Sequence, residues 1–171
     1  MDPINLKNTL KKGGKVYGTM LWGIDSARLT SFLDSEYLDY AIIEAEHAPR
    51  TLYQINSMTT ALRNKNITSI VRITSPNPEI AGATIDAGAD GILIPYCENI
   101  EELKLSFGRT YFNPLKGEYL KKVLDTGEFP SKKSEDYLRE KSKSRLFILG
   151  VESVPAVENL ENMINSVENI D

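Results

Sequence analysis

The sequence AIIEAEHAPR at residues 41–50 places the only histidine of the chain directly after a short apolar run. His47 is preceded by carboxylates at Glu46 and Glu44, one and three residues earlier. Histidine is the side chain that most readily gains and loses a proton near neutral pH, and a carboxylate bonded to one ring nitrogen makes the other more basic. We therefore interpret these residues as a candidate proton-transfer group. The competing interpretation is a histidine that only bridges or caps the start of a helix.

A second candidate is Arg72, which lies inside the apolar sequence IVRI at residues 70–73. A guanidinium among apolar neighbours is costly unless an anion pairs with it. The residue pattern favours two interpretations equally. Arg72 forms a buried salt bridge with a glutamate, or it holds the carboxylate of a substrate through two parallel hydrogen bonds.

A third candidate is Glu152, an acid that ends the apolar run at residues 146–151. Hard divalent cations prefer carboxylate oxygen, so Glu152 could be a metal ligand. The alternative is an acid near the start of a helix that begins around Pro155, where it would interact favourably with the helix dipole.

The segment PYCE at residues 95–98 follows another apolar run. Pro95 ends that run, and we expect it to form a wall of the substrate pocket. Cys97 has no histidine available beyond the one already assigned, which disfavours a thiol nucleophile.

These residues need elements that bring them together, and the sequence alternates two kinds of segment. Strands are predicted at residues 16–22, 39–44, 68–73, 91–95 and 146–152, and helices at residues 26–35, 50–64, 79–87, 100–107 and 155–167. The strand segments show little alternation of apolar and polar residues, which indicates parallel strands buried on both faces. The four candidate sites then fall at carboxyl ends of strands, where α/β proteins build their active sites.

The repeat of roughly 25 residues over the first four units is typical of a (β/α)8 barrel. Residues 108–145 interrupt this repeat as an insertion, and we interpret its charged part, residues 131–145, as a solvated helix and loop. Five strands are visible and a sixth could begin at residues 170–171, whereas a full barrel has eight. The chain is therefore either an open α/β sheet or the first part of a barrel. We expect residues 1–171 to be a single, incomplete barrel domain with five to six βα units.

Composition narrows the classes of partner. The chain has a formal net charge of -4 and an isoelectric point near 5.2, which argues against a general nucleic-acid binder. No apolar segment approaches the ~20 residues that span a bilayer, and the first residues do not resemble a secretory signal. The single cysteine fits a reducing compartment. We expect a cytoplasmic protein without membrane or nucleic-acid partners.

Four segments together resemble one known family. They are IIEAEHAP at residues 42–49, VR at 71–72, DAGADGILIP at 86–95 and GVES at 150–153. In this order and spacing they are similar to the 4-hydroxy-2-oxoheptanedioate / 2-dehydro-3-deoxyglucarate aldolases, the citrate-lyase-like class II pyruvate aldolases. The resemblance extends over residues 6–171, and its first and third segments are quite specific.

The resemblance implies a (β/α)8 barrel that assembles into homo-oligomers and reversibly cleaves 4-hydroxy-2-oxo acids to pyruvate and an aldehyde. It implies a divalent cation, Mg²⁺, Mn²⁺ or Co²⁺, that stabilises the enolate of pyruvate so that no lysine Schiff base is needed. By this resemblance His47 is the acid/base and Glu44 its carboxylate partner. Arg72 holds the carboxylate or keto oxygen of pyruvate, and Glu152 is a metal ligand.

The chain departs from the family pattern at several places. Glu44 stands where relatives often have aspartate, and Gly150 where many have glutamine. The loop at residues 111–117 replaces the common YPPxGxRG sequence, so a different substrate preference is expected. Relatives continue past the position of Asp171 into a GPxDLS segment, whose aspartate is their second metal ligand. We therefore expect the second carboxylate ligand to lie beyond Asp171.

Two other functions remain open at this stage. The chain could be a natural short form that does not catalyse and instead serves as a binding or oligomerising module. It could also be an acyl-CoA lyase like the β subunit of citrate lyase, although the EHAP sequence at residues 46–49 favours the aldolase branch.

Overall fold

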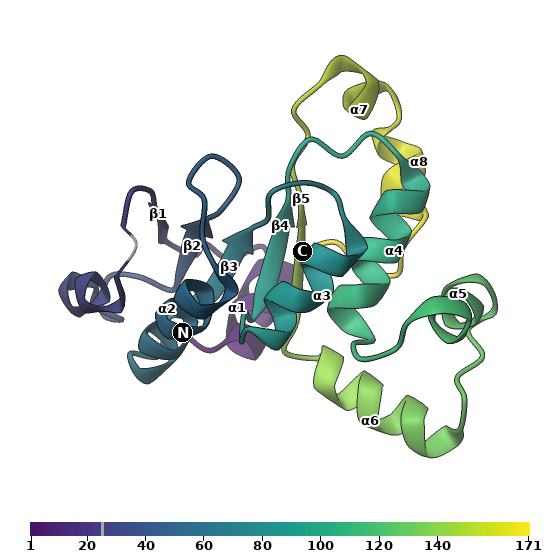
Figure 1. Cartoon of the computed structure of the whole chain (residues 1–171), viewed down its shortest axis with the longest axis horizontal. Coiled ribbons are helices and arrows are strands. Elements are labelled where there is room, and N and C mark those ends of the chain that lie inside the picture. The colour runs from purple at the N-terminus through teal and green to yellow at the C-terminus, as the bar shows by residue number, and fades with distance from the viewer. Residues whose placement is uncertain (25) are drawn as a thin grey trace.

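A parallel five-stranded sheet forms the centre of the computed structural model, which describes residues 1–24 and 26–171. The strands follow one another across the sheet in chain order (Figure 1). They are β1 (Gly18–Leu21), β2 (Tyr40–Glu44), β3 (Thr68–Arg72), β4 (Gly91–Ile94) and β5 (Leu146–Leu149). All four strand pairs are parallel, as the apolar runs predict.

Helices connect and flank these strands. They are α1 (Pro3–Lys11), α2 (Leu52–Asn64), α3 (Pro78–Asp86), α4 (Ile100–Tyr111), α5 (Gly117–Thr126), α6 (Lys132–Ser142), α7 (Val154–Glu158) and α8 (Leu160–Asn165), with a 3₁₀ helix, η1 (Ala27–Phe32), after β1. Capping side chains mark several starts. At α2, Thr51 accepts a hydrogen bond from the N–H of Gln54, whose side chain bonds back to the N–H of Thr51.

The order of the strands identifies the type of α/β fold. In a doubly wound sheet the strand order reverses part-way and helices cover both faces, whereas in a barrel each strand lies beside its sequence neighbours. Here α2, α3 and α4 lie together on one face of the sheet, and α1 lies on the other (Figure 1). The five βα units are therefore arranged as in a (β/α)8 barrel, which confirms the predicted fold class.

The two faces of the sheet have separate apolar cores. On the outer face, fully buried side chains such as Ile43, Val71 and Ile92 pack against the connecting helices. On the inner face, Ile70 and Leu146 pack against Leu6 of α1. Glu44 and Arg72 share the parity of the inner-face residues because side chains alternate along a strand. The carboxyl ends of β2 and β3 therefore direct these two charged side chains toward the inside of the barrel.

Several element predictions were wrong in detail. Helix α1 was not expected, although Asp2 caps it and Pro3 occupies its first turn. The helix expected at residues 26–35 is the shorter 3₁₀ helix η1, and that expected at residues 155–167 is two short helices that meet at Asn159. The strand expected at 146–152 ends at Leu149, so Glu152 lies in the loop beyond it.

The region after β4 is more regular than predicted. Helix α4 continues to Tyr111, past the expected end at residue 107, and residues 108–145 also contain α5 and α6. In Figure 1 these two helices project away from the sheet. They contribute Leu120, Val123 and Leu138 to the outer core.

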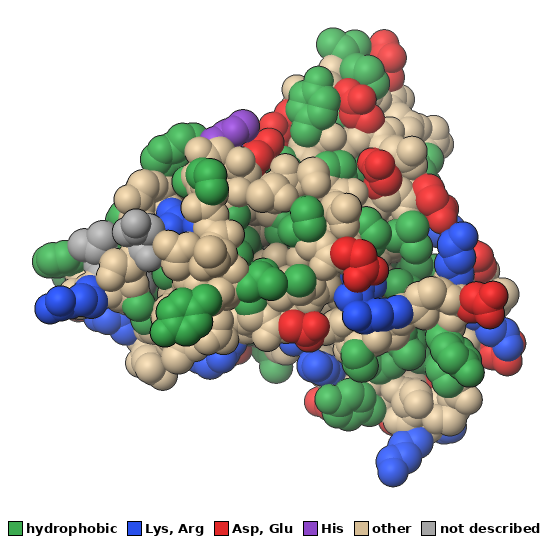
Figure 2. All heavy atoms as spheres, in the orientation of Figure 1, with side chains coloured by type: hydrophobic (Ala, Val, Ile, Leu, Met, Phe, Trp, Pro, Cys, Tyr) green, Lys and Arg blue, Asp and Glu red, His purple; other side chains and the backbone are tan. Residues whose placement is uncertain are grey.

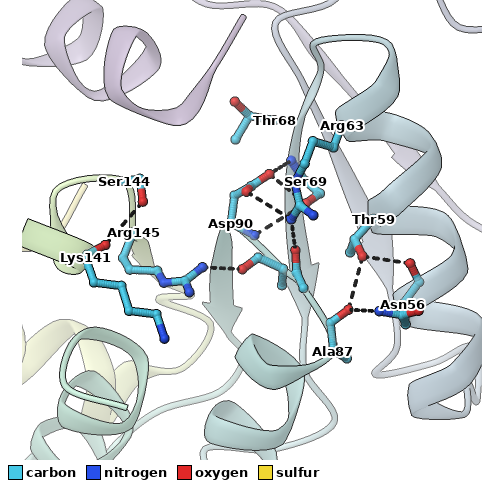
Figure 3. A network of polar contacts seen from close by, with 12 residues as sticks. Asn56, Thr59, Arg63, Thr68, Ser69, Ala87, Asp90, Lys141, Ser144 and Arg145 are labelled. Carbon is cyan, nitrogen blue, oxygen red and sulfur yellow. Dashed lines mark hydrogen bonds and ion pairs between the residues drawn. The ribbon is translucent and has the colours of Figure 1, made fainter. Parts of the chain in front are cut away.

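A polar network holds the amino-terminal edge of the sheet in place (Figure 3). Asp90 accepts hydrogen bonds from the N–H of Ser69 at 2.9 Å and from its hydroxyl at 2.8 Å. Arg145 donates to the carbonyl of Ala89 at 2.8 Å. These bonds link the turn before β4 to the starts of β3 and β5, so the carboxyl ends of the strands meet at the opposite edge.

The first helix and the last residues are joined by a buried ion pair. Lys7 of α1 is buried, and its Nζ lies 3.3 Å from Oδ1 of Asp171 and donates to the hydroxyl of Tyr111 at 2.8 Å. The N–H of Asp171 donates to the carbonyl of Phe147 in β5 at 2.9 Å. The structure assigns no strand at residues 170–171, but this bond places Asp171 beside β5, where a sixth strand would lie.

Candidate functional site

Glu44 and Arg72 form the centre of the candidate site. They end β2 and β3 and face one another in the sheet register. The Glu44 residue is fully buried, and Nε of Arg72 donates to its Oε2 at 2.5 Å. Of the two interpretations left open for Arg72, the buried ion pair is therefore present in the structure.

The other carboxylate oxygen of Glu44 organises the loop that follows β2. Its Oε1 accepts hydrogen bonds from the main-chain N–H groups of Glu46 and His47, at 2.8 and 2.9 Å. Burial alone raises the pKa of Glu44, but the bonds from Arg72 and from these N–H groups outweigh it and hold the pKa below its ordinary value. Glu44 is thus an ionised, buried anchor.

The expected pairing of Glu44 with the imidazole of His47 is not what the structure contains. Both oxygens of Glu44 are occupied by Arg72 and by main-chain N–H groups, because the loop folds back over the end of β2. The carboxylate near the ring is that of Glu46, whose Oε2 lies 3.5 Å from Nε2 of His47. The sequence placed Glu46 in the candidate proton-transfer group, but the family resemblance gave the role of carboxylate partner to Glu44.

Glu46 also lies beside Arg72. Its Oε2 is 3.1 Å from Nη1 of Arg72. This oxygen is buried, yet it makes no hydrogen bond of good geometry within the described part of the chain. Acidic and basic side chains therefore alternate along a continuous row of contacts, from Glu44 through Arg72 and Glu46 to His47.

His47 itself is accessible. Its side chain is 59% exposed, and it lies on the surface where Figure 2 shows the one purple residue. The ring packs near that of Trp22, with centroids 6.0 Å apart and planes tilted by 37°. Trp22 follows β1 and is itself exposed. An imidazole in this place can reach a small molecule above the strand ends.

Arg72 keeps part of its binding capacity. Burial alone lowers the pKa of its guanidinium, but Glu44, Glu46 and Glu152 outweigh this and raise it, so the group stays charged. Its side chain is 15% exposed, and its Nη2 has no hydrogen-bond partner within residues 1–24 and 26–171. A planar guanidinium fixed on one side and open on the other is suited to hold an anionic or carbonyl oxygen.

Sequence reasoning missed Arg50, which joins the ends of two strands. Its Nε donates to the carbonyl of Glu44 at 2.6 Å, and its Nη2 donates to the carbonyl of Leu21 at 3.1 Å. Arg50 thereby links the ends of β2 and β1. An arginine at the start of a predicted helix gives no signal of this role, because the contact depends on how the loop turns.

The remaining candidates lie at the ends of β4 and β5. Pro95 is buried directly after β4, and Glu152 is exposed in the loop after β5. Gly150 lies between them, since an added Cβ there would be 2.6 Å from Oε1 of Glu152 and 2.8 Å from the carbonyl oxygen of Ile94. Glycine at this position thus leaves the space that the Glu152 carboxylate uses, which a glutamine would fill.

Comparison with known proteins shows the family to which this chain belongs. Residues 19–171 match the model of the HpcH/HpaI aldolase/citrate lyase family. The chain belongs to this family. The match covers all five strands except the first residue of β1, and so includes every candidate residue described above.

Relatives in this family are named as aldolases. The chain is 25% identical over 169 residues to the 4-hydroxy-2-oxo-heptane-1,7-dioate aldolase of Salmonella paratyphi C. That alignment covers 96% of this chain and 62% of the relative. It is 31% identical over 98 residues to the hydroxypyruvate/pyruvate aldolase of Roseovarius nubinhibens, covering 57% of this chain and 38% of that protein. The chain thus spans less than two thirds of the length of these relatives.

Solved structures share the fold. An HpcH/HpaI aldolase from Desulfitobacterium hafniense superposes with a TM-score of 0.76 at 24% identity, covering 97% of this chain and 63% of that one. Macrophomate synthase superposes with a TM-score of 0.71 at 21% identity, over 98% of this chain and 58% of that one. At these identities the likeness supports the fold.

The family resemblance implies a divalent cation, and the described residues can be compared with the ligands that such a cation needs. Mg²⁺ and its relatives take about six oxygen ligands, usually including one or two protein carboxylates. Within residues 1–24 and 26–171, no three side chains of His, Cys, Asp or Glu gather closely enough to hold a metal ion. The exposed carboxylate of Glu152 is a suitable oxygen donor, but the described residues do not form a complete metal site.

Proposed function

We propose that this chain carries the proton-transfer and oxo-acid-binding half of a carbon–carbon lyase. The reaction is reversible cleavage of a 4-hydroxy-2-oxo acid to pyruvate and an aldehyde. The observation that carries this proposal is the contiguous set Glu44, Arg72, Glu46 and His47 at the carboxyl edge of the sheet. It joins a fixed cation to an exposed imidazole that can carry a proton, and enolate chemistry uses groups of both kinds.

In this proposal Arg72 binds the oxo acid. Its Nε and Nη1 are held by Glu44 and Glu46, which leaves Nη2 to donate to the carboxylate or keto oxygen of pyruvate. Because the ion pair fixes the guanidinium plane before substrate arrives, little side-chain freedom is lost on binding. Pro95, buried at the end of β4, would form one wall of the pocket.

His47 moves the proton. During cleavage a base removes the proton of the 4-hydroxyl group as the carbon–carbon bond breaks, and the enolate is then protonated at carbon to give pyruvate. The imidazole is exposed and shares the neighbour Glu46 with Arg72, so it can approach a substrate that Arg72 holds. A correctly placed proton carrier accelerates such a step by roughly 10²–10⁴-fold.

The proposal includes a divalent cation, Mg²⁺, Mn²⁺ or Co²⁺, with Glu152 as one ligand and a second carboxylate from beyond Asp171. When bound, such a cation would supply positive charge that stabilises an enolate. It also includes a cytoplasmic location, which the free thiol of Cys97 supports, and assembly into a homo-oligomer. None of the described helices is long and apolar enough to cross a bilayer.

The test is exchange of the methyl protons of pyruvate in D₂O, followed by mass spectrometry with Mg²⁺, Mn²⁺ or Co²⁺ added. We expect the full-length protein to catalyse exchange and its His47→Ala variant to lose it by about 10²-fold or more. Removal of the metal by a chelator should also stop exchange.

The control is Glu118→Ala, which removes an exposed carboxylate on α5, far along the chain from the strand ends. It should exchange at the wild-type rate, and circular dichroism should be equal for all three proteins. Lack of exchange with every metal by the wild-type protein would overturn the proposal and favour a non-catalytic binding module. An active His47→Ala variant would show that another residue moves the proton.

A further inference from the structure

The Glu46 carboxylate is the one charged group of the site whose contacts leave an oxygen unsatisfied. Its Oε2 is buried, lies 3.1 Å from Nη1 of Arg72 and 3.5 Å from Nε2 of His47, and makes no hydrogen bond of good geometry within the described residues. A buried acceptor left in this state is costly, so it needs a donor. The imidazole of His47 is a donor on both nitrogens once it is protonated.

The neighbouring elements define what faces that imidazole. From its own loop comes Glu46, from β3 comes Arg72, and from the end of β1 comes the uncharged ring of Trp22. Glu152, beyond β5, acts on the charge of Arg72. Arg72 is itself neutralised by Glu44 through a bond of 2.5 Å, which leaves the charge of Glu46 available to His47.

We propose that Glu46 is a positioning residue that holds the His47 imidazole and stabilises it when it takes up a proton. When a proton moves from the substrate hydroxyl to His47, a positive charge forms on the ring and is matched by the Glu46 carboxylate 3.5 Å away. Glu46 also orients Arg72, so one side chain connects the group that binds the oxo acid to the group that moves the proton. This inference rests on the proposed function for its consequence in catalysis, although the interaction itself does not.

The chain offers a direct readout, because His47 is its only histidine. The carbon-bound ring protons of His47 therefore give the only imidazole signals in an NMR spectrum of the 171-residue protein. Their chemical shifts are followed against pH in wild type and in Glu46→Gln, which keeps the shape of the side chain and removes its charge. We expect the titration midpoint to move to lower pH, because the protonated ring loses the anion that faces it.

Two further variants separate charge from packing. Glu46→Asp keeps the charge, and its midpoint should lie closer to that of wild type than to that of Glu46→Gln. Glu118→Gln removes an exposed charge elsewhere and should leave the midpoint in place. A midpoint that is unmoved in Glu46→Gln, or moved equally in Glu46→Asp, would overturn the inference. If Glu46→Gln does not fold, wild type alone tests the charge: added salt screens the Glu46 carboxylate and should move the His47 midpoint to lower pH, and a midpoint that salt does not move would overturn the inference.

Catalysis supplies the second readout. In pyruvate exchange, the acidic limb of the pH–rate profile should move to lower pH in Glu46→Gln by the same amount as the NMR midpoint. A purely structural role would lower the rate without moving that limb, and would overturn the inference. If wild type shows no exchange but the NMR midpoint moves, the proposed function fails while the role of Glu46 stands. If wild type exchanges but neither the NMR midpoint nor the acidic limb moves in Glu46→Gln, the proposed function stands and the inferred role of Glu46 fails.

Discussion

At the scale of single residues, Glu44 is the side chain on which most of the site depends. It is fully buried, and its two oxygens receive one charged donor and two main-chain donors. Removing one partner of a buried ion pair is far more costly than the pair is stabilising, because the other charge is left behind. Glu44 therefore links the stability of the protein to the geometry of Arg72 and of the loop that carries His47.

A pH-dependent contribution to stability follows. Because the folded-state pKa of Glu44 is lowered, the group stabilises the protein above its unfolded pKa of about 4.3. That contribution is lost as the pH falls below about 4.3 and through the folded pKa. In Glu44→Gln we expect the free energy of unfolding at pH 7 to fall by about 3 kcal/mol.

Urea denaturation from pH 7 to pH 3 would measure this. The difference between wild type and Glu44→Gln should narrow across the acidic end of that range. In Glu118→Gln, where the carboxylate is exposed, the free energy of unfolding should stay within about 0.5 kcal/mol of wild type at each pH. A constant difference between wild type and Glu44→Gln at all pH values would exclude ionisation of Glu44 as its cause.

At the scale of elements, α1 does more than precede the first strand. Its Leu6 covers the inner face of the sheet, and its Lys7 reaches Asp171 and Tyr111 at the far end of the chain. Burial lowers the pKa of Lys7, with Asp171 opposing that effect, while burial and the negative charge of Asp171 raise the pKa of Tyr111. Helix α1 thus covers the inner face of the sheet, and its buried Lys7 depends on Asp171 and Tyr111 for its polar contacts.

Helix α1 carries one buried and one exposed lysine, whose substitutions can be compared. Lys7→Ala should reduce the free energy of unfolding by about 3 kcal/mol, because Asp171 remains buried without its partner. Lys11→Ala, on an exposed position of the same helix, should change it by less than about 0.5 kcal/mol. Thermal and urea denaturation would measure both, and equal effects would show that the ion pair has no special weight.

At the scale of the whole molecule, the sheet has free edges. Within the described chain β1 is bonded only to β2, and exposed apolar side chains such as Met20 and Trp22 lie on or beside it. An unpaired strand edge with apolar side chains is a template for pairing with another chain. We propose that residues 1–171 are one part of a single barrel domain whose remaining strands would cover these edges.

Self-association of the 171-residue chain is therefore expected. Light scattering after size exclusion should give a mass that rises with protein concentration. Met20→Lys places a charge on the edge strand β1 and should lower that mass toward the monomer value. Tyr119→Lys, which removes an exposed apolar side chain on α5, is the control and should not. Equal masses for the two variants would argue against association through β1.

Much of the barrel could be predicted from local pattern. The segments that form β2, β3 and β4 are short, apolar and bounded by turn or helix signals. This is the sequence pattern of parallel strands buried on both faces, and it depends only on nearby residues. The positions of Glu44 and Arg72 at strand ends followed from the same runs. Helix α1 was missed although Asp2 and Pro3 are start signals in the sequence, and its docking on the inner face of the sheet is a contact that local pattern does not report.

The sequence by itself determined which side chains stand at the carboxyl ends of the strands, because strand boundaries depend on nearby residues. Only the tertiary structure decided how those side chains pair. Glu44 and Glu46 are equivalent by type and lie close to His47 in the chain, yet the fold of one loop directs Glu44 to Arg72 and Glu46 to the imidazole. The reason is physical: a buried carboxylate must find donors, and the charged donor to Glu44 comes from a neighbouring strand 28 residues away in the chain.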